Sequence, residues 1–155
     1  MVRPFVTVQH RMWHILYNIL LILASPVILV VLLSKKRCRR GLCQRMGGRP
    51  SCAERFSRPV IWIHAVSLGE VVAVAPLVRR LHERSPEFAL VVSTVTETGR
   101  EAVERLLAGV AHHCYAPLDF SWAVTKAIEA LRPRLFLFVE TELWPNLLRQ
   151  LAVRG

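Results

Sequence analysis

Apolar residues follow one pattern before residue 59 and another after it, and the first pattern is a single uninterrupted run. Ile15 to Leu33 are 19 consecutive residues without a charged side chain. As a helix rising about 1.5 Å per residue, this run spans roughly 28 Å, close to the thickness of the hydrocarbon core of a bilayer. Trp13 and Tyr17 lie at its start, where amphipathic rings favour the membrane interface. The pattern predicts an N-terminal membrane anchor over residues 1–33.

Three alternatives to a bilayer-spanning helix remain open for this run. A cleaved signal peptide has a shorter apolar core and a small-residue cleavage site, and a strongly basic stretch does not follow it. A half-inserted hairpin broken at Pro26, or a helix lying in the interface, would also keep the chain at a membrane. Basic residues concentrate after the run, and this asymmetry predicts that its C-terminal side lies in the cytoplasm.

After residue 59, short apolar runs alternate with segments of helical periodicity. The first two of these runs are rich in β-branched residues, as strands buried in a parallel sheet are. We predict strands over 60–66, 89–95, 112–115 and 135–139, and helices over 71–84, 96–108, 121–131 and 143–153. Four strand–helix repeats indicate right-handed βαβ units, and hence an α/β fold with a Rossmann-like, doubly wound parallel sheet over residues 60–155.

Composition excludes several classes of protein. Hydrophobic residues make up 53% of the 155 residues and charged residues 21%, so the chain is not intrinsically disordered. Seven glycines and four cysteines are too few for collagen or a disulfide scaffold. The cysteines at 38, 43, 52 and 114 form no C-x-x-C pair, so we expect no zinc site.

Most of the net charge of +10 comes from one short stretch. Residues 34–59 hold nine basic side chains and one acidic one, whereas residues 60–155 hold ten of each. The stretch has no interleaved aromatic residues and directly follows the apolar run, so we expect no nucleic-acid partner. Attraction to an anionic membrane surface, worth about 1 kcal/mol per Lys or Arg, is the simpler explanation. We therefore interpret residues 34–59 as a basic juxtamembrane linker.

The usual signatures of nucleotide and hydrolase sites are absent from the sequence. It contains no G-x-G-x-x-G, no G-x-x-x-x-G-K-[ST] and no G-x-S-x-G. In doubly wound sheets, ligands bind beyond the carboxyl ends of the strands, so the residues that follow each strand are the candidates for a site. These residues fall in the stretches 67–70, 94–99, 117–119 and 140–142.

Small, hydroxyl and carboxylate side chains gather in these four turns. Backbone amides at Ser67 and Gly69 could face an anionic group at a helix N-terminus, or the two residues could only form a tight turn. Hydroxyl groups in the second turn could bond to substrate hydroxyls, although the last of them could instead cap its helix; these are Thr94, Thr96 and Thr98. Glu140 and Glu142 form a carboxylate pair at a strand end, where Glu142 could also be an ordinary acid of a first helical turn.

Several of these stretches occur together, and in the same order, in one known family. The segment His64-Ala-Val-Ser-Leu-Gly-Glu70 resembles the H-x-V-S-x-G-E motif of the 3-deoxy-D-manno-octulosonic acid (Kdo) transferases, which are inner-membrane enzymes of lipopolysaccharide synthesis. The resemblance continues through Thr94–Gly99, Pro117–Asp119 and Arg132–Arg134, and it ends in Glu140-Thr-Glu-Leu-Trp-Pro-Asn146. It covers nearly the whole chain, including the apolar run and the basic stretch.

The resemblance implies a two-domain glycosyltransferase-B (GT-B) fold that requires no metal. In that family the N-terminal domain receives the lipid A precursor (lipid IVA), and the C-terminal domain holds the donor CMP-Kdo. Kdo passes to a sugar hydroxyl with inversion at the cytoplasmic face of the bacterial inner membrane. Residues 60–155 would then be the acceptor-side domain, and we expect the donor domain to be missing from this chain, which alone would be inactive.

The resemblance also implies that Glu70 is the general base. A sugar hydroxyl is a poor nucleophile, and a positioned carboxylate that takes its proton contributes typically about 10²–10⁴-fold to the rate. A helix N-terminus favours the anion and so weakens such a base, which burial or a second carboxylate would have to oppose. In the simplest structural interpretation, Glu70 only completes the first turn of the helix.

One residue departs from the family pattern, since Glu97 stands where the family has proline. An added acid there would change the local charge and the contacts with the acceptor. Two other functions remain open for the chain. It could belong to another membrane-associated GT-B enzyme that glycosylates lipids, or it could be a non-catalytic, membrane-tethered α/β module that binds a headgroup or a protein.

Overall fold

The computed structural model describes residues 5–34, 39–50, 52–53, 56–140 and 144–154, and it divides into two compact units. The first unit, Met1–Arg39, contains the helix α1 over Phe5–Ser34. Its segment Met12–Ser34 is long and apolar enough to cross a membrane, and none of that segment is buried. The prediction of an apolar N-terminal helix is therefore confirmed.

Helix α1 continues through Pro26, which contradicts the alternative of a hairpin broken at that residue. Proline has no N–H, so it leaves the carbonyl four residues earlier, that of Ile22, without its usual donor. The hydroxyl of Ser25 donates to this Ile22 carbonyl at 2.6 Å. A neighbouring side chain thus replaces the lost backbone bond, as in membrane helices that tolerate proline.

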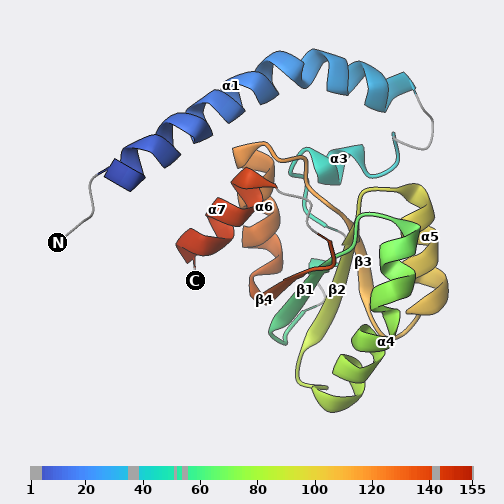
Figure 1. Ribbon diagram of the computed structural model, residues 1–155. Helices are drawn as coiled ribbons and strands as arrows, with labels where there is room; N and C mark the ends of the chain where they lie inside the picture. The colour runs from blue at the N-terminus through green and yellow to red at the C-terminus, as the bar shows by residue number, and fades with distance from the viewer. Residues whose placement is uncertain (1–4, 35–38, 51, 54–55, 141–143, 155) are drawn as a thin grey trace. The chain divides into compact units, whose positions relative to one another are not determined.

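The second unit, Arg40–Gly155, is built on a four-stranded parallel sheet in the order β3-β2-β1-β4 (Figure 1). The strands are β1 (Val60–His64), β2 (Ala89–Thr94), β3 (His112–Tyr115) and β4 (Pro133–Phe138). The helices that follow them are α4 (Leu68–Arg84), α5 (Glu97–Leu106), α6 (Ser121–Leu131) and α7 (Pro145–Arg154). All eight elements are those that the sequence predicts, so the α/β fold with a parallel sheet is confirmed.

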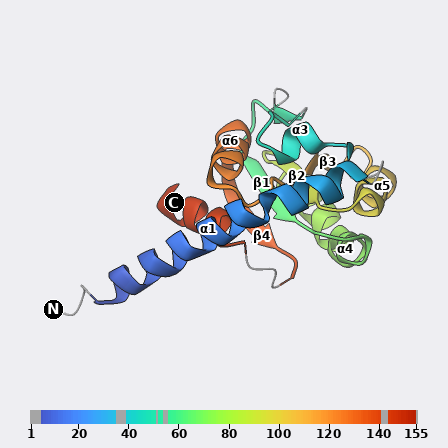
Figure 2. The same cartoon turned by 90° about the horizontal axis from the view of Figure 1, so that it is seen from above.

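Two hydrophobic clusters, one on each face of the sheet, form the core. Residues of α4 and α5 pack with Ile61 and Ile63 on one face, and residues of α6 and α7 pack with Val60 and Trp62 on the other. Figure 2 shows α4 and α6 on opposite sides of the strands. Alternate residues of β1 face opposite layers, which explains why this strand is apolar throughout.

Strand β4 is not buried, contrary to the sequence-based expectation. It lies at one edge of the sheet, and Leu135 and Phe138 are 46% and 37% exposed. Among the described residues its hydrogen-bonded neighbour is β1 alone. A run of apolar residues has the same pattern in a central strand and in an edge strand, so the sequence could not distinguish the two positions.

The second unit begins well inside the stretch predicted as a linker. A short helix, α3 (Leu42–Arg45), packs against β3, and Cys52 and Ala53 belong to the core. Gly41 has φ 72°, and a Cβ at this position would lie 1.9 Å from the ring of Tyr115. Glycine therefore allows the chain to enter α3 in close contact with β3.

Candidate functional site

The turn between β1 and α4 positions Glu70. Ser67 is the N-cap of α4, and its hydroxyl accepts a bond from the Glu70 amide at 3.5 Å. The Glu70 carboxylate reaches back and accepts from the Val66 amide and the Ser67 hydroxyl, both at 2.8 Å. This arrangement is a variant of the capping box, in which the carboxylate accepts from the Val66 amide and the Ser67 hydroxyl instead of the N-cap amide, so the sequence S-x-x-E itself places the carboxylate. Each carboxylate oxygen can still accept one further bond, which leaves Glu70 able to receive a proton.

Gly69 is not required by the turn in which it lies. Its φ is not positive, and a Cβ there would meet only the Ser67 hydroxyl, at 4.0 Å. The residue is exposed in the first turn of α4, beside the buried Glu70. The backbone conformation therefore does not require glycine at this position. The small size of Gly69 leaves the N-terminus of α4 open to an approaching group.

His64 ends β1 next to this turn and is almost completely buried. The Trp62 indole donates to the Ser93 hydroxyl at 2.8 Å, and the same hydroxyl lies 2.8 Å from His64 Nδ1. Because the indole can only donate, the hydroxyl proton is free to go to Nδ1, which would leave the imidazole proton on Nε2. Among the described residues, Nε2 has no hydrogen-bond partner. Burial lowers the pKa of His64 to about 4, against the opposing effect of Glu70, so the ring is neutral.

The Thr-rich turn after β2 uses most of its hydroxyls internally. The buried Thr94 hydroxyl donates to the Thr96 carbonyl at 3.2 Å and lies 2.9 Å from His113 Nε2. Thr96 is the N-cap of α5 and accepts from the Gly99 amide at 3.1 Å. Thr98 does not cap the helix, contrary to the alternative considered for it. It is exposed, with one weak contact to the Thr96 hydroxyl at 3.4 Å.

Glu97 is buried and balanced by cations, so its charge is not free to alter the site as the sequence suggested. Its carboxylate pairs with Arg40 at 2.9 Å and with Arg100 at 2.8 Å, and it accepts from the Tyr115 hydroxyl at 2.5 Å. Burial alone raises the pKa of Glu97, but hydrogen bonds from Arg100, Tyr115 and Arg40 outweigh this effect and lower the pKa to about 2. Glu97 thus ties the start of the second unit to β3.

Asp119 and Asn146 connect the third turn to α7. The Asp119 carboxylate accepts from the amides of Asn146 and Leu147, each at 2.9 Å, and so caps the first turn of α7. Helix α7 begins at Pro145, whose missing N–H needs no partner at that position. Trp144 lies 5.6 Å from the His64 ring, centroid to centroid. The run Trp144–Asn146 therefore contributes packing and helix initiation.

The predicted site residues meet at the carboxyl edge of the sheet. The Val66 carbonyl accepts from the Val95 amide at 3.0 Å, which joins the turns after β1 and β2. The Val139 amide donates to the His64 carbonyl at 3.1 Å, so the exposed Glu140 follows directly beside β1. Glu142 lies outside the described residues. Across the described part of the chain, no group of three potential metal ligands comes together.

Sequence reasoning missed Trp62 and Ser93, which hold the His64 ring. No local signal marks them, because they are apolar or small residues within buried strands. The alternation of faces is the one clue available, since residues 62 and 64 of a strand point to the same side.

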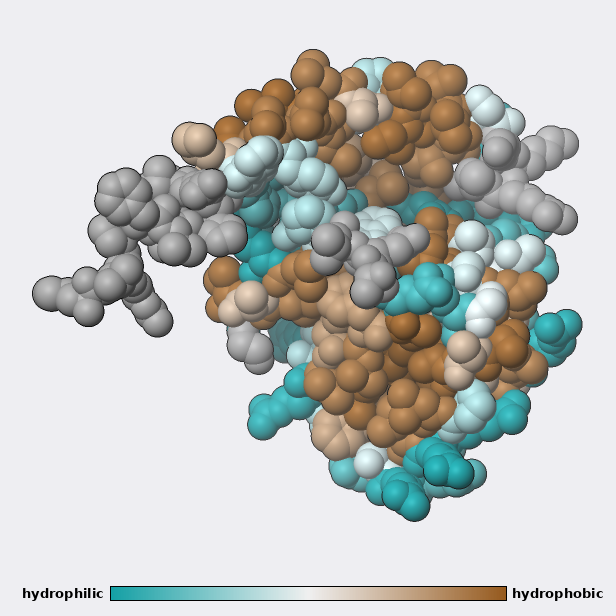
Figure 3. All heavy atoms as spheres, in the orientation of Figure 1, coloured by the Kyte–Doolittle hydropathy of each residue, from teal (hydrophilic) through white to brown (hydrophobic). Residues whose placement is uncertain are grey.

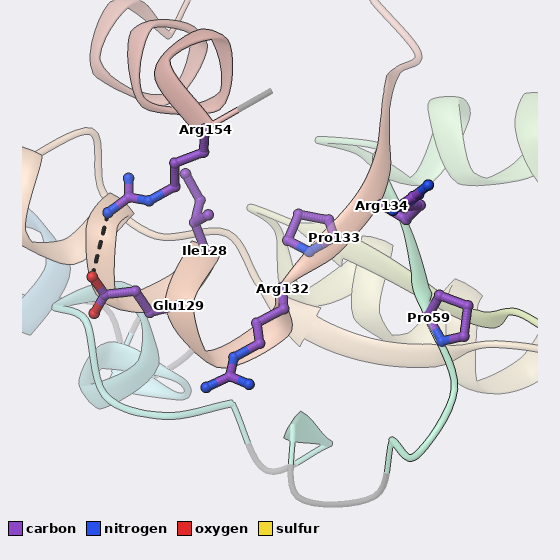
Figure 4. Close-up of a pocket in the computed structure, with 7 residues that line it drawn as sticks. All are labelled: Pro59, Ile128, Glu129, Arg132, Pro133, Arg134 and Arg154. Carbon is purple, nitrogen blue, oxygen red and sulfur yellow. Dashed lines mark hydrogen bonds and ion pairs between the residues drawn. The ribbon is translucent and has the colours of Figure 1, made fainter.

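A hollow lies at the opposite end of the sheet. It has a volume of about 900 Å³ and is lined by Pro59, Pro133 and the ends of α6 and α7 (Figure 4). Arg154 pairs with Glu129 across it at 3.3 Å. Because Pro59 and Pro133 lie at the amino ends of β1 and β4, this hollow is remote from the edge where α/β folds bind ligands.

Comparisons with known proteins point to one family. Residues 39–155 match the family described as 3-deoxy-D-manno-octulosonic-acid transferase (kdotransferase). A 3-deoxy-D-manno-octulosonic acid transferase of Haemophilus influenzae is 40% identical over 150 residues, which are 93% of this chain and 34% of that protein. One of Bordetella pertussis with the same name is 38% identical over 100 residues, which are 61% of this chain and 23% of that protein. The chain thus spans about a third of the first relative's length and less of the second's. No solved structure matches it.

Proposed function

Because the chain belongs to the Kdo transferase family, we propose that it is the acceptor-binding part of a membrane-anchored glycosyltransferase. The whole protein would transfer Kdo from CMP-Kdo to the lipid A precursor, lipid IVA, with inversion and without a metal or other cofactor. Residues 40–155 would be the first domain of a GT-B fold, and a second domain would hold CMP-Kdo. The observation that carries the proposal is the Glu70 carboxylate, held at the carboxyl edge of the sheet by two hydrogen bonds.

In the proposed reaction, Glu70 accepts the proton of a sugar hydroxyl on the acceptor. The hydroxyl oxygen forms a bond to the anomeric carbon of Kdo while the bond from that carbon to the CMP phosphate breaks, and CMP leaves with the electron pair. Val66 and Ser67 keep the carboxylate in one orientation during this step. Holding reacting groups in the productive geometry is itself a large part of catalysis.

We place the remaining candidate residues around the acceptor. Amides at Ser67 and Gly69 would face an acceptor phosphate, since Gly69 leaves the N-terminus of α4 uncovered. Thr98 and Glu140 are exposed and could contact sugar hydroxyls directly. Thr94 and Thr96 would shape the turn that holds Thr98, because their hydroxyls already have partners. We retain Glu142 as a second acceptor-binding carboxylate on the family motif alone.

We propose that α1 anchors the enzyme in the bacterial inner membrane with the catalytic unit in the cytoplasm. The apolar segment Met12–Ser34 and the basic excess that follows it support this orientation. Some basic side chains in the described part of 34–59 bond within the second unit. Arg40 pairs with Glu97, Arg45 donates to the Val95 carbonyl, and Arg58 donates to the Pro86 carbonyl. These three side chains would therefore contribute less to attraction to anionic headgroups.

The full-length protein carrying Glu70→Gln tests the catalytic assignment. Transfer of Kdo from CMP-Kdo to lipid IVA should fall by about 10²–10⁴-fold in kcat, because the general base is removed while the cap retains a hydrogen-bonding side chain. Glu83→Gln, an exposed acid in the last turn of the same helix, should leave kcat unchanged. Normal turnover by the Glu70 variant would exclude Glu70 as the base.

Two further measurements separate this function from the alternatives. The 155-residue chain alone should transfer no Kdo, because CMP-Kdo would have no binding domain. If the full-length protein used a different activated sugar and not CMP-Kdo, it would be another lipid glycosyltransferase. Absence of transfer from any sugar donor would favour a binding module.

A further inference from the structure

The outer half of α4 carries no charge over its first three turns. Within Leu68–Val78 the single charged residue, Glu70, is buried with Val71, Val74, Ala75 and Val78 against the sheet side. At about 100° per residue, the remaining positions cover roughly half of the helix circumference. They are all exposed and all uncharged: Leu68, Gly69, Val72, Ala73, Pro76 and Leu77.

Such a helix does not match an ordinary surface helix, which is apolar toward the core and polar toward water. Leu68, Val72 and Leu77 are 41%, 51% and 48% exposed. Helix α4 lies toward the viewer in Figure 1, and the same view in Figure 3 shows a broad hydrophobic area on this side of the unit. A contiguous apolar area of this kind marks an interaction surface.

Charge returns abruptly in the last turns of α4. Arg79, Arg80 and Arg84 follow the apolar part, with Glu83 as the one acid among them. The Arg79 guanidinium donates to the Leu106 carbonyl at 2.8 Å. Arg80 and Arg84 are exposed on the outer side, so an apolar area ends in a basic one along a single helix.

We propose that this outer face of α4 lies in the interfacial region of an anionic bilayer, with its apolar side chains at the acyl boundary and Arg80 and Arg84 at lipid phosphates. Amphipathic helices that bind membrane surfaces combine these two features. A second copy of the chain is a poorer occupant, because the outer face of its own α4 offers the same apolar and arginine side chains and no excess of negative charge for Arg80 and Arg84. A bilayer supplies both an apolar layer and fixed negative charge.

The location of this face also gives it a role in the reaction. This part of the inference rests on the proposed function. Glu70 and the open position at Gly69 lie in the first turn of the same helix. A lipid whose acyl chains stay in the bilayer would therefore present its headgroup to the carboxylate without leaving the membrane.

Site-directed spin labels on the full chain in vesicles test the contact itself. With Cys38 and Cys43 replaced by serine, a label at Ala73→Cys reports on the outer face, and one at Lys126→Cys, exposed on α6, is the control. The vesicles contain equal parts of phosphatidylethanolamine and phosphatidylglycerol. Vesicles should increase collisions of the Ala73 label with oxygen and suppress those with a water-soluble nickel complex, whereas the control should not change.

Every other outcome overturns the proposal. Unchanged collisions at Ala73 would mean that the face stays in water. Loss of collisions with both reagents would mean that protein, from a second copy or another chain, covers it. These readings need no catalysis, so they stand even if the protein does not transfer Kdo.

A kinetic variant then tests the role in the reaction. Val72→Asp with Leu77→Asp in the full-length protein should raise KM for lipid IVA in vesicles by about tenfold or more, since two apolar side chains no longer enter the bilayer. The kcat value, and the KM for a water-soluble acceptor without acyl chains, should not change. Equal KM increases for both acceptors would show that the substitutions damage the site instead.

Discussion

Glu97 connects three parts of the second unit through its carboxylate. It binds Arg40 at the start of that unit, Arg100 on its own helix and Tyr115 on β3. The neighbouring Arg45 lies over the Tyr115 ring at 4.6 Å and donates to the Val95 carbonyl at 2.6 Å. A residue that first suggested a change in substrate contacts therefore stabilises the packing of α3.

Glu97→Gln should lower the free energy of unfolding by about 1–3 kcal/mol at neutral pH, because a buried cluster loses its anion. The folded-state pKa of about 2 lies below the ordinary value of 4.5. The stabilisation is therefore present above about pH 4.5 and is lost as the pH falls toward 2. Urea denaturation across this range should show the stability difference from the parent chain shrinking with falling pH.

Glu101→Gln provides the control for this measurement, since Glu101 is exposed on the same helix. It should change the stability little at any pH. A Glu97→Gln difference that stays constant down to pH 2 would contradict the ionic origin of the stabilisation.

For single residues, the sequence predicted which side chains lie near the candidate site but not which of them bind each other. The motif around Glu70 is local, and its capping box follows from a spacing of three residues. Arg40 and Glu97 are 57 residues apart, and Trp62 and Ser93 are 31 apart. Such pairs depend on strand register, which a single sequence does not specify.

Helix beginnings determine how the candidate site is built. Thr96 caps α5 and Asp119 caps α7, so two residues that looked like ligands are structural at the level of the element. Thr98, two positions after the cap, remains exposed.

The two threonines form a matched pair for testing these roles. Thr96→Ala should reduce stability by about 1 kcal/mol through loss of the N-cap, measured by thermal or urea denaturation. Thr98→Ala should stay within about 0.5 kcal/mol of the parent chain, as exposed substitutions usually do. In the full-length protein, a higher KM for the acceptor in the Thr98 variant would support its contact with substrate. Equal destabilisation by both substitutions would contradict the cap assignment.

Element type was predictable because hydrophobic periodicity is a local property, whereas position in the sheet was not. Periodicity identified each strand and helix from β1 onward. It did not reveal that β4 lies at an edge or that α3 lies within a stretch that reads as basic linker. Arg45 is an example, because it is buried and nothing in the sequence distinguishes a buried arginine from an exposed one.

Across the whole molecule, charge and hydrophobicity are divided between the two units. The first unit has an apolar helix, and the second has a neutral sheet domain whose basic N-terminal stretch is partly bound to it. If α1 is the anchor, apolar burial rather than charge holds the protein at the membrane.

Vesicle association should therefore survive high salt. At an ionic strength of about 1 M the Debye length is only about 3 Å, which removes most headgroup attraction but not apolar burial. Flotation should recover the chain with the vesicles under these conditions. A variant with Leu23→Arg and Val27→Arg should be released, because each arginine opposes insertion by about 2.5–3.5 kcal/mol. Release of the parent chain by salt would show that its binding is electrostatic.

The two edge strands of the sheet, β3 and β4, differ, and this difference determines where further strands can be added. On β3, the Tyr115 amide that faces away from β2 donates to the Gln44 side chain at 3.0 Å. Helix α3 therefore covers this edge of the sheet. At the other edge, among the described residues, no helix covers the outward backbone groups of β4 in this way. Strands can therefore be added on one side only, and the same asymmetry makes β4 the point at which an unfolded segment or a foreign strand would attach.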